Sequence, residues 1–173
     1  TPAPALGDRA GWRARVACVY QKPSVVGELS VAENLFLNRQ PRGRFGMVSW
    51  SRLRREAREL LDSWAIPADP ETPAKELTVE QRQLVEIAGA LSLGARFVIL
   101  DEPTAQLERR AIVRLFDRLH DLREQGVTFV FISHHLPEIY EICQRVTVFR
   151  DARHVLTAPV NELDHDQLVA AMI

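Results

Sequence analysis

Residues 97–103 of the 173-residue chain read Phe97-Val98-Ile99-Leu100-Asp101-Glu102-Pro103, four apolar residues followed by two acidic residues and a proline. Apolar residues followed by two adjacent carboxylates are typical of a buried strand that delivers acidic side chains to a site at its end. In nucleotide hydrolysis, Asp101 would help to hold Mg²⁺ and Glu102 would polarise the water that attacks the γ-phosphate. The alternative interpretation is a core strand that ends in a solvated acidic turn.

The segments that follow this strand predict a parallel sheet. A helix is indicated by apolar residues at helical spacing, namely Ile112, Leu115, Phe116, Leu119 and Leu122. A turn at Gly126 and a strand over residues 127–132 come next. The order strand, helix, strand implies a right-handed crossover between parallel strands. We expect a helix over residues 137–144, strands near 146–149 and 154–157, and a terminal helix capped at Asp164.

The segments before this strand predict one more strand and a group of helices. Residues 16–20 read as a short buried strand, with Gln21 at its end. The motif Ser30-Val31-Ala32-Glu33 has capping-box spacing and predicts a helix through Leu37. A longer helix is expected over residues 49–65. A second capping box, Thr78-Val79-Glu80-Gln81, predicts a helix whose apolar face carries Leu84, Ile87, Ala88 and Leu91.

The composition excludes several classes of function. Apolar residues make up 46% and charged residues 26%, which is ordinary for one globular domain. With 22 basic and 23 acidic residues the formal charge is −1, so no overall basic field argues for nucleic acid binding. No stretch approaches the roughly 20 apolar residues that cross a bilayer. Cys18 and Cys143 lack metal-ligand spacing, which indicates buried thiols and a reducing compartment.

Four separated features occur in a recognisable order. They are Gln21 after a strand, the capped helix start Leu77-Thr78-Val79-Glu80-Gln81, the acids Asp101-Glu102, and His134 after a strand. Alone, Gln21 is more often a surface turn residue and a histidine after a strand is more often a helix cap. Together the features resemble the ATP-binding subunits of ABC transporters, with their Q-loop, signature motif, Walker B strand and H-loop. The resemblance covers roughly residues 15–157, and residues 103–108 look like the D-loop.

The resemblance implies a fold and a set of site residues. The fold would be α/β: the C-terminal part of a P-loop NTPase (RecA-like) core with a parallel sheet, plus an α-helical signature subdomain. The helical subdomain would span about residues 30–93, and the core about residues 15–29 and 94–173. Glu102 and His134 would be catalytic, with His135 as the competing histidine. Gln21 and residues 77–81 would bind ATP, and Asp101 and Gln21 would hold Mg²⁺.

The motif at residues 77–81 departs from the usual Leu-Ser-Gly-Gly-Gln signature. Val79 and Glu80 replace glycines that allow close backbone approach to a phosphate, and Glu80 adds a negative charge. Relaxed signatures are familiar among sugar-import ATPases of the ribose, xylose and galactose type. Other segments are similar to that subgroup, namely residues 30–37, 45–50, 85–92 and 132–150. Glu108 stands where the D-loop normally carries Asp.

The largest departure from the family pattern is the absence of a phosphate-binding P-loop. That motif needs Gly-x-x-x-x-Gly-Lys-Ser/Thr, and neither Lys22 nor Lys75 follows a glycine. The chain is therefore expected to begin after the P-loop and to hydrolyse ATP negligibly by itself.

The resemblance also implies a change in the sheet, because in the family the strand that carries the P-loop lies next to the strand that precedes the H-loop histidine. Loss of the P-loop strand would leave the strands that end at Gln21, Asp101 and His134 adjacent, with one edge of the His134 strand open. We expect the strand near Val146 or another chain to cover that edge, since unpaired edges invite association of copies.

The function that the resemblance implies is ATP hydrolysis that powers carbohydrate import. Its partners would be a second nucleotide-binding domain, transmembrane permease subunits and, indirectly, a sugar-binding protein. Its location would be cytoplasmic, peripheral on the inner face of the cell membrane. One alternative is a non-transport ABC-type ATPase in DNA repair or translation, which the lack of coiled-coil or basic insertions disfavours. The other is a nucleotide-inactive interaction module, which the joint presence of Asp101, Glu102 and His134 disfavours.

Overall fold

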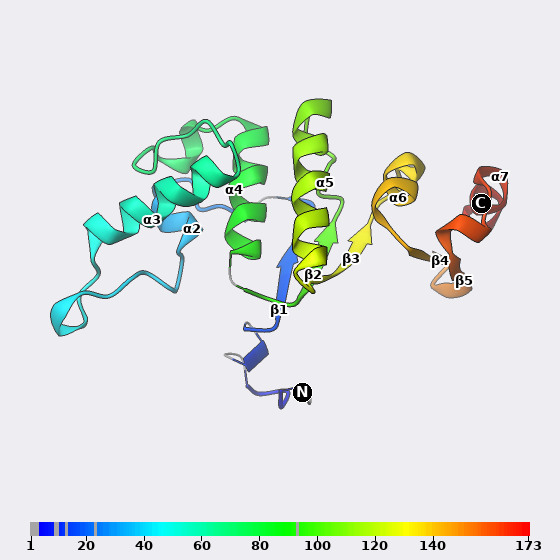
Figure 1. The fold of residues 1–173 in the computed structure, drawn as a ribbon, viewed down its shortest axis with the longest axis horizontal. Helices are drawn as coiled ribbons and strands as arrows, with labels where there is room; N and C mark the ends of the chain where they lie inside the picture. The colour runs from blue at the N-terminus through cyan, green and yellow to red at the C-terminus, as the bar shows by residue number, and fades with distance from the viewer. Residues whose placement is uncertain (1–3, 9–10, 13, 23, 93) are drawn as a thin grey trace. The chain divides into compact units, whose positions relative to one another are not determined.

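The computed structural model describes residues 4–8, 11–12, 14–22, 24–92 and 94–173 (Figure 1). It separates into two compact units, Thr1–Val130 and Phe131–Ile173. Among the described residues, no helix has both the length and the apolar composition needed to cross a membrane.

A parallel sheet organises the first unit. Strand β1 (Val16–Val19) pairs in parallel with β2 (Phe97–Asp101), with Val16 opposite Phe97 and Val19 opposite Leu100. The strand order is β1-β2-β3, where β3 is Thr128–Ile132. The predicted parallel sheet is therefore confirmed. The strand that ends at Asp101 lies between the strands that precede Gln21 and His134 in one sheet, as predicted.

Three helices lie between β1 and β2 in the chain and pack on one another (Figure 1). They are α2 (Val31–Leu35), α3 (Trp50–Ser63) and α4 (Val79–Leu91), with short 3₁₀ turns η1 (Arg44–Gly46) and η2 (Ala74–Glu76) in the connections. Both predicted capping boxes are present, because the hydroxyls of Ser30 and Thr78 accept the backbone N–H three residues on. Helix α5 (Arg109–Glu124) follows β2.

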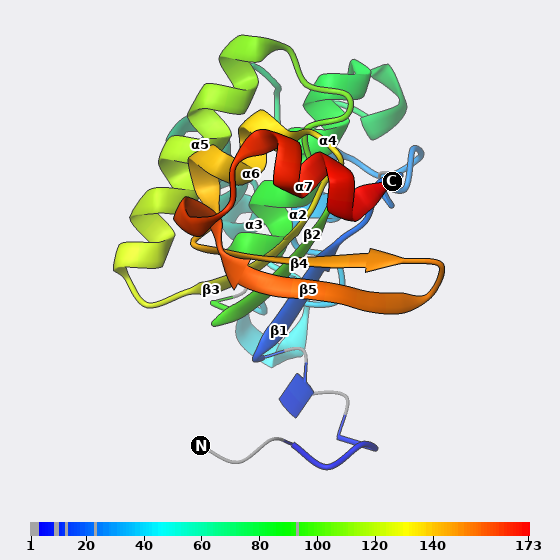
Figure 2. The same ribbon diagram turned by 90° about the vertical axis from the view of Figure 1, so that its right-hand side faces the viewer.

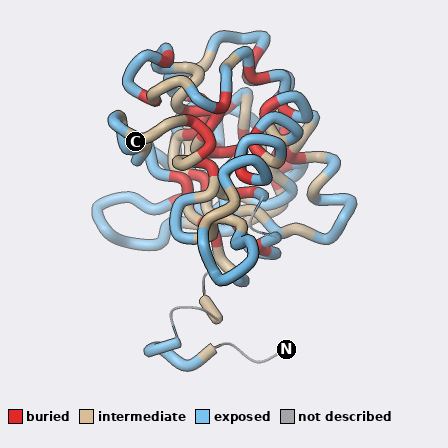
Figure 3. The backbone as a smooth tube through the Cα atoms, turned by 90° about the vertical axis from the view of Figure 1, so that its left-hand side faces the viewer, coloured by how far each residue is buried: buried red, intermediate tan, exposed pale blue. Residues whose placement is uncertain are grey.

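The apolar residues that predict these helices form the core of the first unit (Figure 3, red). In α3 the side chains of Leu53 and Leu61 are 1% exposed, and in α4 that of Ile87 is 0% exposed. The strand residues Val98 and Leu100 are equally inaccessible. Burial of this face, rather than intrinsic helix propensity, stabilises such short helices.

Helix α2 ends at Leu35, two residues earlier than predicted, and the half-buried Arg39 lies at this end. Nη2 of Arg39 donates to the carbonyl oxygens of Leu35 at 2.6 Å and Gly89 at 3.1 Å, and to Oγ of Ser92 at 2.6 Å. Burial lowers the pKa of the Arg39 guanidinium. One side chain thus satisfies carbonyls that the last turns of α2 and α4 leave without helical partners.

The second unit is a β-hairpin with helices (Figure 2). Its elements are α6 (Leu136–Ile142), β4 (Arg145–Arg150), β5 (Arg153–Pro159), η3 (Val160–Glu162) and α7 (His165–Met172). Strands β4 and β5 pair antiparallel, and a core of its own includes Leu136, Val148 and Leu168. The predicted cap of the terminal helix at Asp164 is confirmed.

One of the two candidate partners for the open edge of the sheet is paired elsewhere. The strand near Val146 was one of two candidates for covering the edge of the strand that precedes His134. In the described residues, β4 pairs with β5 in a separate two-stranded sheet and not with β3. A hairpin partner two residues away costs little chain entropy to reach, which favours the pairing of β4 with β5. Coverage of the edge by another chain stays a prediction.

We expect that Ile87→Ala will lower the free energy of unfolding by about 2–5 kcal/mol, because it leaves a cavity at a fully buried position of α4. The control is Val113→Ala on α5, whose side chain is 51% exposed and should cost less than about 0.5 kcal/mol. Urea unfolding followed by circular dichroism measures both. Equal losses in the two variants would contradict this assignment of the core.

Candidate functional site

The ends of β1 and β2 bring two of the predicted site residues together. Because these strands are parallel neighbours, Gln21 and Glu102 follow them at the same edge of the sheet. Nε2 of Gln21 donates a hydrogen bond of 2.8 Å to Oε2 of Glu102. Residues 81 positions apart in the chain thus form one contact at the end of the sheet.

The backbone at Glu102 is strained. Its φ is +43°, in the left-handed region. Adopting this conformation costs a residue with a Cβ about 1–2 kcal/mol. The chain turns at once, since the carbonyl of Glu102 accepts from the N–H of Ala105 and that of Thr104 accepts from the N–H of Leu107. Strain of this kind clusters at functional sites, where the surrounding structure holds it in place.

The predicted signature segment, Leu77 to Gln81, forms the N-terminus of α4, which is closed by a capping box. Thr78 is the N-cap: its Oγ1 accepts from the N–H of Gln81, and its N–H donates to Oε1 of Gln81 at 2.8 Å. Nε2 of Gln81 donates to the carbonyl of Pro67 at 2.7 Å, so this amide is bound within the protein. Leu77 is buried, whereas Val79 is 46% exposed.

The charge that Glu80 adds to the helix start is partly offset. Oε1 of Glu80 lies 4.0 Å from Nη2 of Arg114 on α5. Backbone N–H groups in the first turn of a helix have no intrahelical acceptors, and the helix dipole adds positive potential there. The groups of this segment that suit an anion are therefore the N–H groups of Val79 and Glu80.

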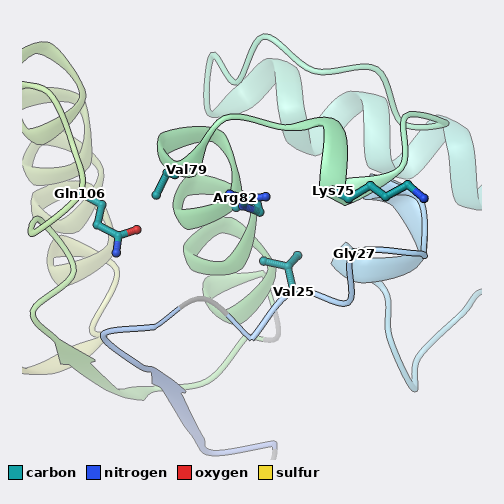
Figure 4. Close-up of a pocket in the computed structure, with 6 residues that line it drawn as sticks. All are labelled: Val25, Gly27, Lys75, Val79, Arg82 and Gln106. Atoms are coloured by element: carbon teal, nitrogen blue, oxygen red, sulfur yellow. The ribbon is translucent and has the colours of Figure 1, made fainter.

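A pocket of about 410 Å³ lies beside this helix start (Figure 4). The pocket is lined by residues from three parts of the chain. They are Val25 and Gly27 after β1, Lys75, Val79 and Arg82 of η2 and α4, and Gln106 in the turn after β2. Lys75 pairs with Glu28 at 2.9 Å. The sequence analysis missed Arg82 and Gln106, although Arg82 is three residues after Val79 and so shares its helix face.

The connection after Gln21 is bound to α4 by a carboxylate that the sequence analysis also missed. Oε1 of Glu86 accepts from Oγ of Ser24 at 2.6 Å, and Oε2 accepts from the N–H of Ser24 at 3.0 Å. Glu86 is half-buried. Burial raises the pKa of its carboxyl group, and the two hydrogen bonds from Ser24 oppose that rise.

His134 belongs to the second unit, where it precedes α6. The rings of His134 and His135 lie 4.1 Å apart between centroids, at an interplanar angle of 36°. Oγ of Ser133 accepts from the N–H of His135 at 3.0 Å and donates to Oε2 of Glu138 at 3.2 Å. His135 is the N-cap residue of α6. The remaining predicted site residues, Gln21, residues 77–81, Asp101 and Glu102, belong to the first unit.

The residues predicted to hold Mg²⁺ fit the donors that this ion prefers. No group of three or more His, Cys, Asp or Glu in the described part of the chain could hold a metal by itself. Mg²⁺ instead takes one or two protein oxygens together with phosphate and water oxygens. Asp101 ends β2 and Gln21 follows β1, the neighbouring strand, so their oxygens can supply such a pair.

The parallel sheet, with a helical layer inserted between β1 and β2, is an α/β fold, and the structural comparison places it among the P-loop NTPases. A solved dimeric structure of the ATP-binding cassette MJ0796, in a post-hydrolysis state bound to ADP and Pi, shares this fold. The TM-score is 0.74 at 22% identity, over 86% of this chain and 64% of that one. Residues 4–105 match the family model described as ABC transporter. The chain belongs to the ABC transporter family.

Several curated relatives are named ribose import ATP-binding protein RbsA. The protein from Rhodococcus jostii is 43% identical over 169 residues, which cover 97% of this chain and 34% of the relative. RbsA 3 from Rubrobacter xylanophilus is 48% identical over 161 residues, which cover 93% of this chain and 32% of the relative. The chain thus spans about a third of the length of these relatives.

The Glu86 carboxyl group should make the stability of the protein depend on pH. Its pKa in the folded state is raised from the ordinary 4.5, so the folded state binds this proton more tightly than the unfolded state. The group therefore contributes stability below about pH 4.5 that is lost as pH rises through the raised pKa. Glu86→Gln cannot titrate. We expect the melting temperature of the variant minus that of the wild type to increase from pH 4 to pH 7.

Differential scanning calorimetry at several pH values measures this difference. The matched control is Glu59→Gln on α3, the same substitution at an exposed glutamate that lies 3.8 Å from Arg55. A flat difference for Glu86→Gln would show that its pKa is the same in the folded and unfolded states.

Proposed function

We propose that this chain supplies part of the ATP-hydrolysing site of an ABC importer for carbohydrates and works within a longer ATPase. The observation that carries the proposal is the 2.8 Å contact between Gln21 and Glu102 at the ends of two neighbouring parallel strands. The names of the relatives, ribose import ATP-binding proteins, support the choice of carbohydrate as the transported class. Because the chain spans a third of those relatives, the rest of the machinery would come from outside residues 1–173.

The proposed chemistry assigns a role to each residue at the end of the sheet. Glu102 would polarise the attacking water, and the amide of Gln21 would keep that carboxylate in place. Asp101 and Oε1 of Gln21 would hold Mg²⁺. The ion would neutralise charge on the phosphates. His134 would donate a hydrogen bond to the γ-phosphate and stabilise charge that develops during transfer.

The start of α4 would serve the site of a second nucleotide-binding domain. In this proposal, the N–H groups of Val79 and Glu80 face the phosphates bound by the partner's P-loop. Thr78 and Gln81 would act indirectly, because their side chains close the capping box. The pairing of Glu80 with Arg114 reduces the repulsion that this carboxylate would exert on a phosphate.

The proposal also includes partners and a place in the cell. The helical part, about residues 30–93, would receive motion from permease subunits, and a sugar-binding protein would act through them. The site would be cytoplasmic, at the inner face of the cell membrane. Without a P-loop in residues 1–173, the chain alone would hydrolyse ATP negligibly, since the lysine and the backbone cradle for the phosphates are missing.

We expect Glu102→Gln, introduced into the complete ATPase assembled with its permease, to reduce the rate of ATP hydrolysis at least about 100-fold while ATP binding is retained. Phosphate release and binding of a fluorescent ATP analogue measure the two properties. Glu59→Gln, a glutamate exposed on α3, is the control and should leave both unchanged. Hydrolysis that survives Glu102→Gln would overturn the proposal.

The chain of 173 residues offers a separate test. Calorimetric titration with Mg²⁺ and a non-hydrolysable ATP analogue should give no binding signal. Tight binding that Glu102→Gln and His134→Ala abolish would show that another phosphate cradle exists within these residues. Binding of nucleic acid, and no capture by permease subunits, would instead favour the non-transport ATPase.

A further inference from the structure

The connection between Gln21 and α2 is fastened at two points. At the first, both oxygens of Glu86 accept from Ser24, at 2.6 and 3.0 Å. At the second, the Asn34 side chain of α2 binds both backbone groups of Val26: Oδ1 accepts from its N–H at 2.7 Å and Nδ2 donates to its carbonyl at 3.0 Å. The connection is therefore held to α4 at one point and to α2 at the other.

Glu86 lies on the face of α4 that carries the pocket. Val79, Arg82 and Glu86 are at positions i, i+3 and i+7, which share one helix face. Figure 4 shows Val79 and Arg82 on this face, with Val25 of the connection opposite α4. Glu86 is two turns from the helix start, so a rigid α4 links its position to that of the segment at residues 77–81.

Holding a loop with a half-buried carboxylate costs free energy, because burial disfavours the ionised form. Burial raises the pKa of Glu86, which means that the ionised form is disfavoured there. Hydrogen bonds to a charged acceptor are about twice as strong as neutral ones. An apolar contact would hold the connection loosely, whereas two donors from one residue onto one carboxylate fix both its position and its orientation.

The other end of the same short segment is Gln21, whose Nε2 contacts Glu102. Only two residues separate Gln21 from Ser24, so their Cα atoms can be at most about 11 Å apart. The short chain between them therefore limits how far Gln21 can lie from Ser24. The contacts run from Glu102 to Gln21, along the chain to Ser24, and from Ser24 to Glu86 on α4.

We propose that Glu86 is a positioning residue for Gln21: by holding Ser24 it fixes the Gln21 amide against Glu102 and ties that contact to α4. This inference rests on the proposed function, in which Glu102 acts in ATP hydrolysis. Glu86 itself touches no reacting atom. Its loss should lower the rate of the chemical step and leave ATP affinity nearly unchanged, because only the arrangement around Glu102 is altered.

The test is a double-mutant cycle on ATP hydrolysis by the complete ATPase assembled with its permease. Glu86→Gln keeps the shape of the side chain but loses the charge and one acceptor. We expect kcat to fall about tenfold, with KM for ATP changed less than about twofold. Gln21→Ala should lower kcat but leave residual activity, since Glu102 remains. In the Gln21→Ala background, Glu86→Gln should change kcat by less than about twofold.

A multiplicative cycle, in which Glu86→Gln again costs about tenfold without Gln21, would overturn the inference, because Glu86 would then act independently of Gln21. Ser24 provides a second pair of variants at an exposed position. Ser24→Ala removes the 2.6 Å hydroxyl contact and should lower kcat about threefold. Ser24→Thr keeps the hydroxyl and should restore kcat. Equal kcat in Ser24→Ala and wild type would count against the inference.

Two further variants separate the possible failures. Glu28→Gln lies on the same connection, in an exposed pair with Lys75, and should leave kcat unchanged. If Glu102→Gln leaves hydrolysis intact, the proposed function fails and the inference fails with it. If Glu102→Gln abolishes hydrolysis and the Gln21–Glu86 cycle is multiplicative, the inference alone is wrong.

Discussion

The parallel pairing of β1 with β2 is the constraint on which the candidate site depends. Each strand is short and gains stability only by burying Val19, Val98 and Leu100 between other elements. The ladder begins where the Arg15 carbonyl accepts from the N–H of Phe97 at 3.0 Å. From there the register runs residue by residue, so Gln21 and Glu102 arrive within hydrogen-bonding distance at the other end. A slip of one residue would turn every strand side chain to the opposite face.

The helical layer between these strands holds the connection on which Gln21 lies. Helix α4 presents Leu84, Ile87 and Ala88 to the core, and its opposite margin carries Glu86 toward Ser24. Backbone contacts continue the attachment, since the carbonyls of Gly27 and Leu29 accept from the N–H groups at η2. The packing that stabilises the helices thus also determines where the connection lies. Because cores are close-packed, such an arrangement changes in discrete steps and does not deform gradually.

Local patterns predicted the parts of the fold that local physics determines. The helix starts at Ser30 and Thr78 were predicted from capping-box spacing, and the start at Asp164 from a capping residue. In the structure, a side chain three residues later completes each of the three caps. The end of α2 was placed too late. Its carbonyl is bound by Arg39, a tertiary contact shared with Gly89 that no local pattern encodes.

Contacts between distant residues mark the limit of such prediction. The pair of Ser24 and Glu86 joins residues 62 positions apart, and no local pattern in the sequence assigns Glu86 to Ser24. The contact between Gln21 and Glu102 could be predicted only because both residues follow predicted parallel strands, whose carboxyl ends meet at one edge of the sheet. His134 was grouped with them by its order in the chain, whereas the structure assigns it to the second unit.

Glu80, which departs from the usual signature, has two opposing effects at the start of α4: it stabilises the helix and would repel a phosphate. A helix start is stabilised by an acidic residue in its first turn, because the carboxylate faces the positive end of the helix dipole. The same carboxylate repels a phosphate at that place. Glu80 stabilises the helix start, and Arg114 at 4.0 Å weakens the repulsion. Val79 is tolerated because it is exposed and a β-branched residue costs little in a first turn. With Gln81 committed to Thr78 and Pro67, recognition of an anion here would rely on backbone N–H groups, which every residue except proline supplies.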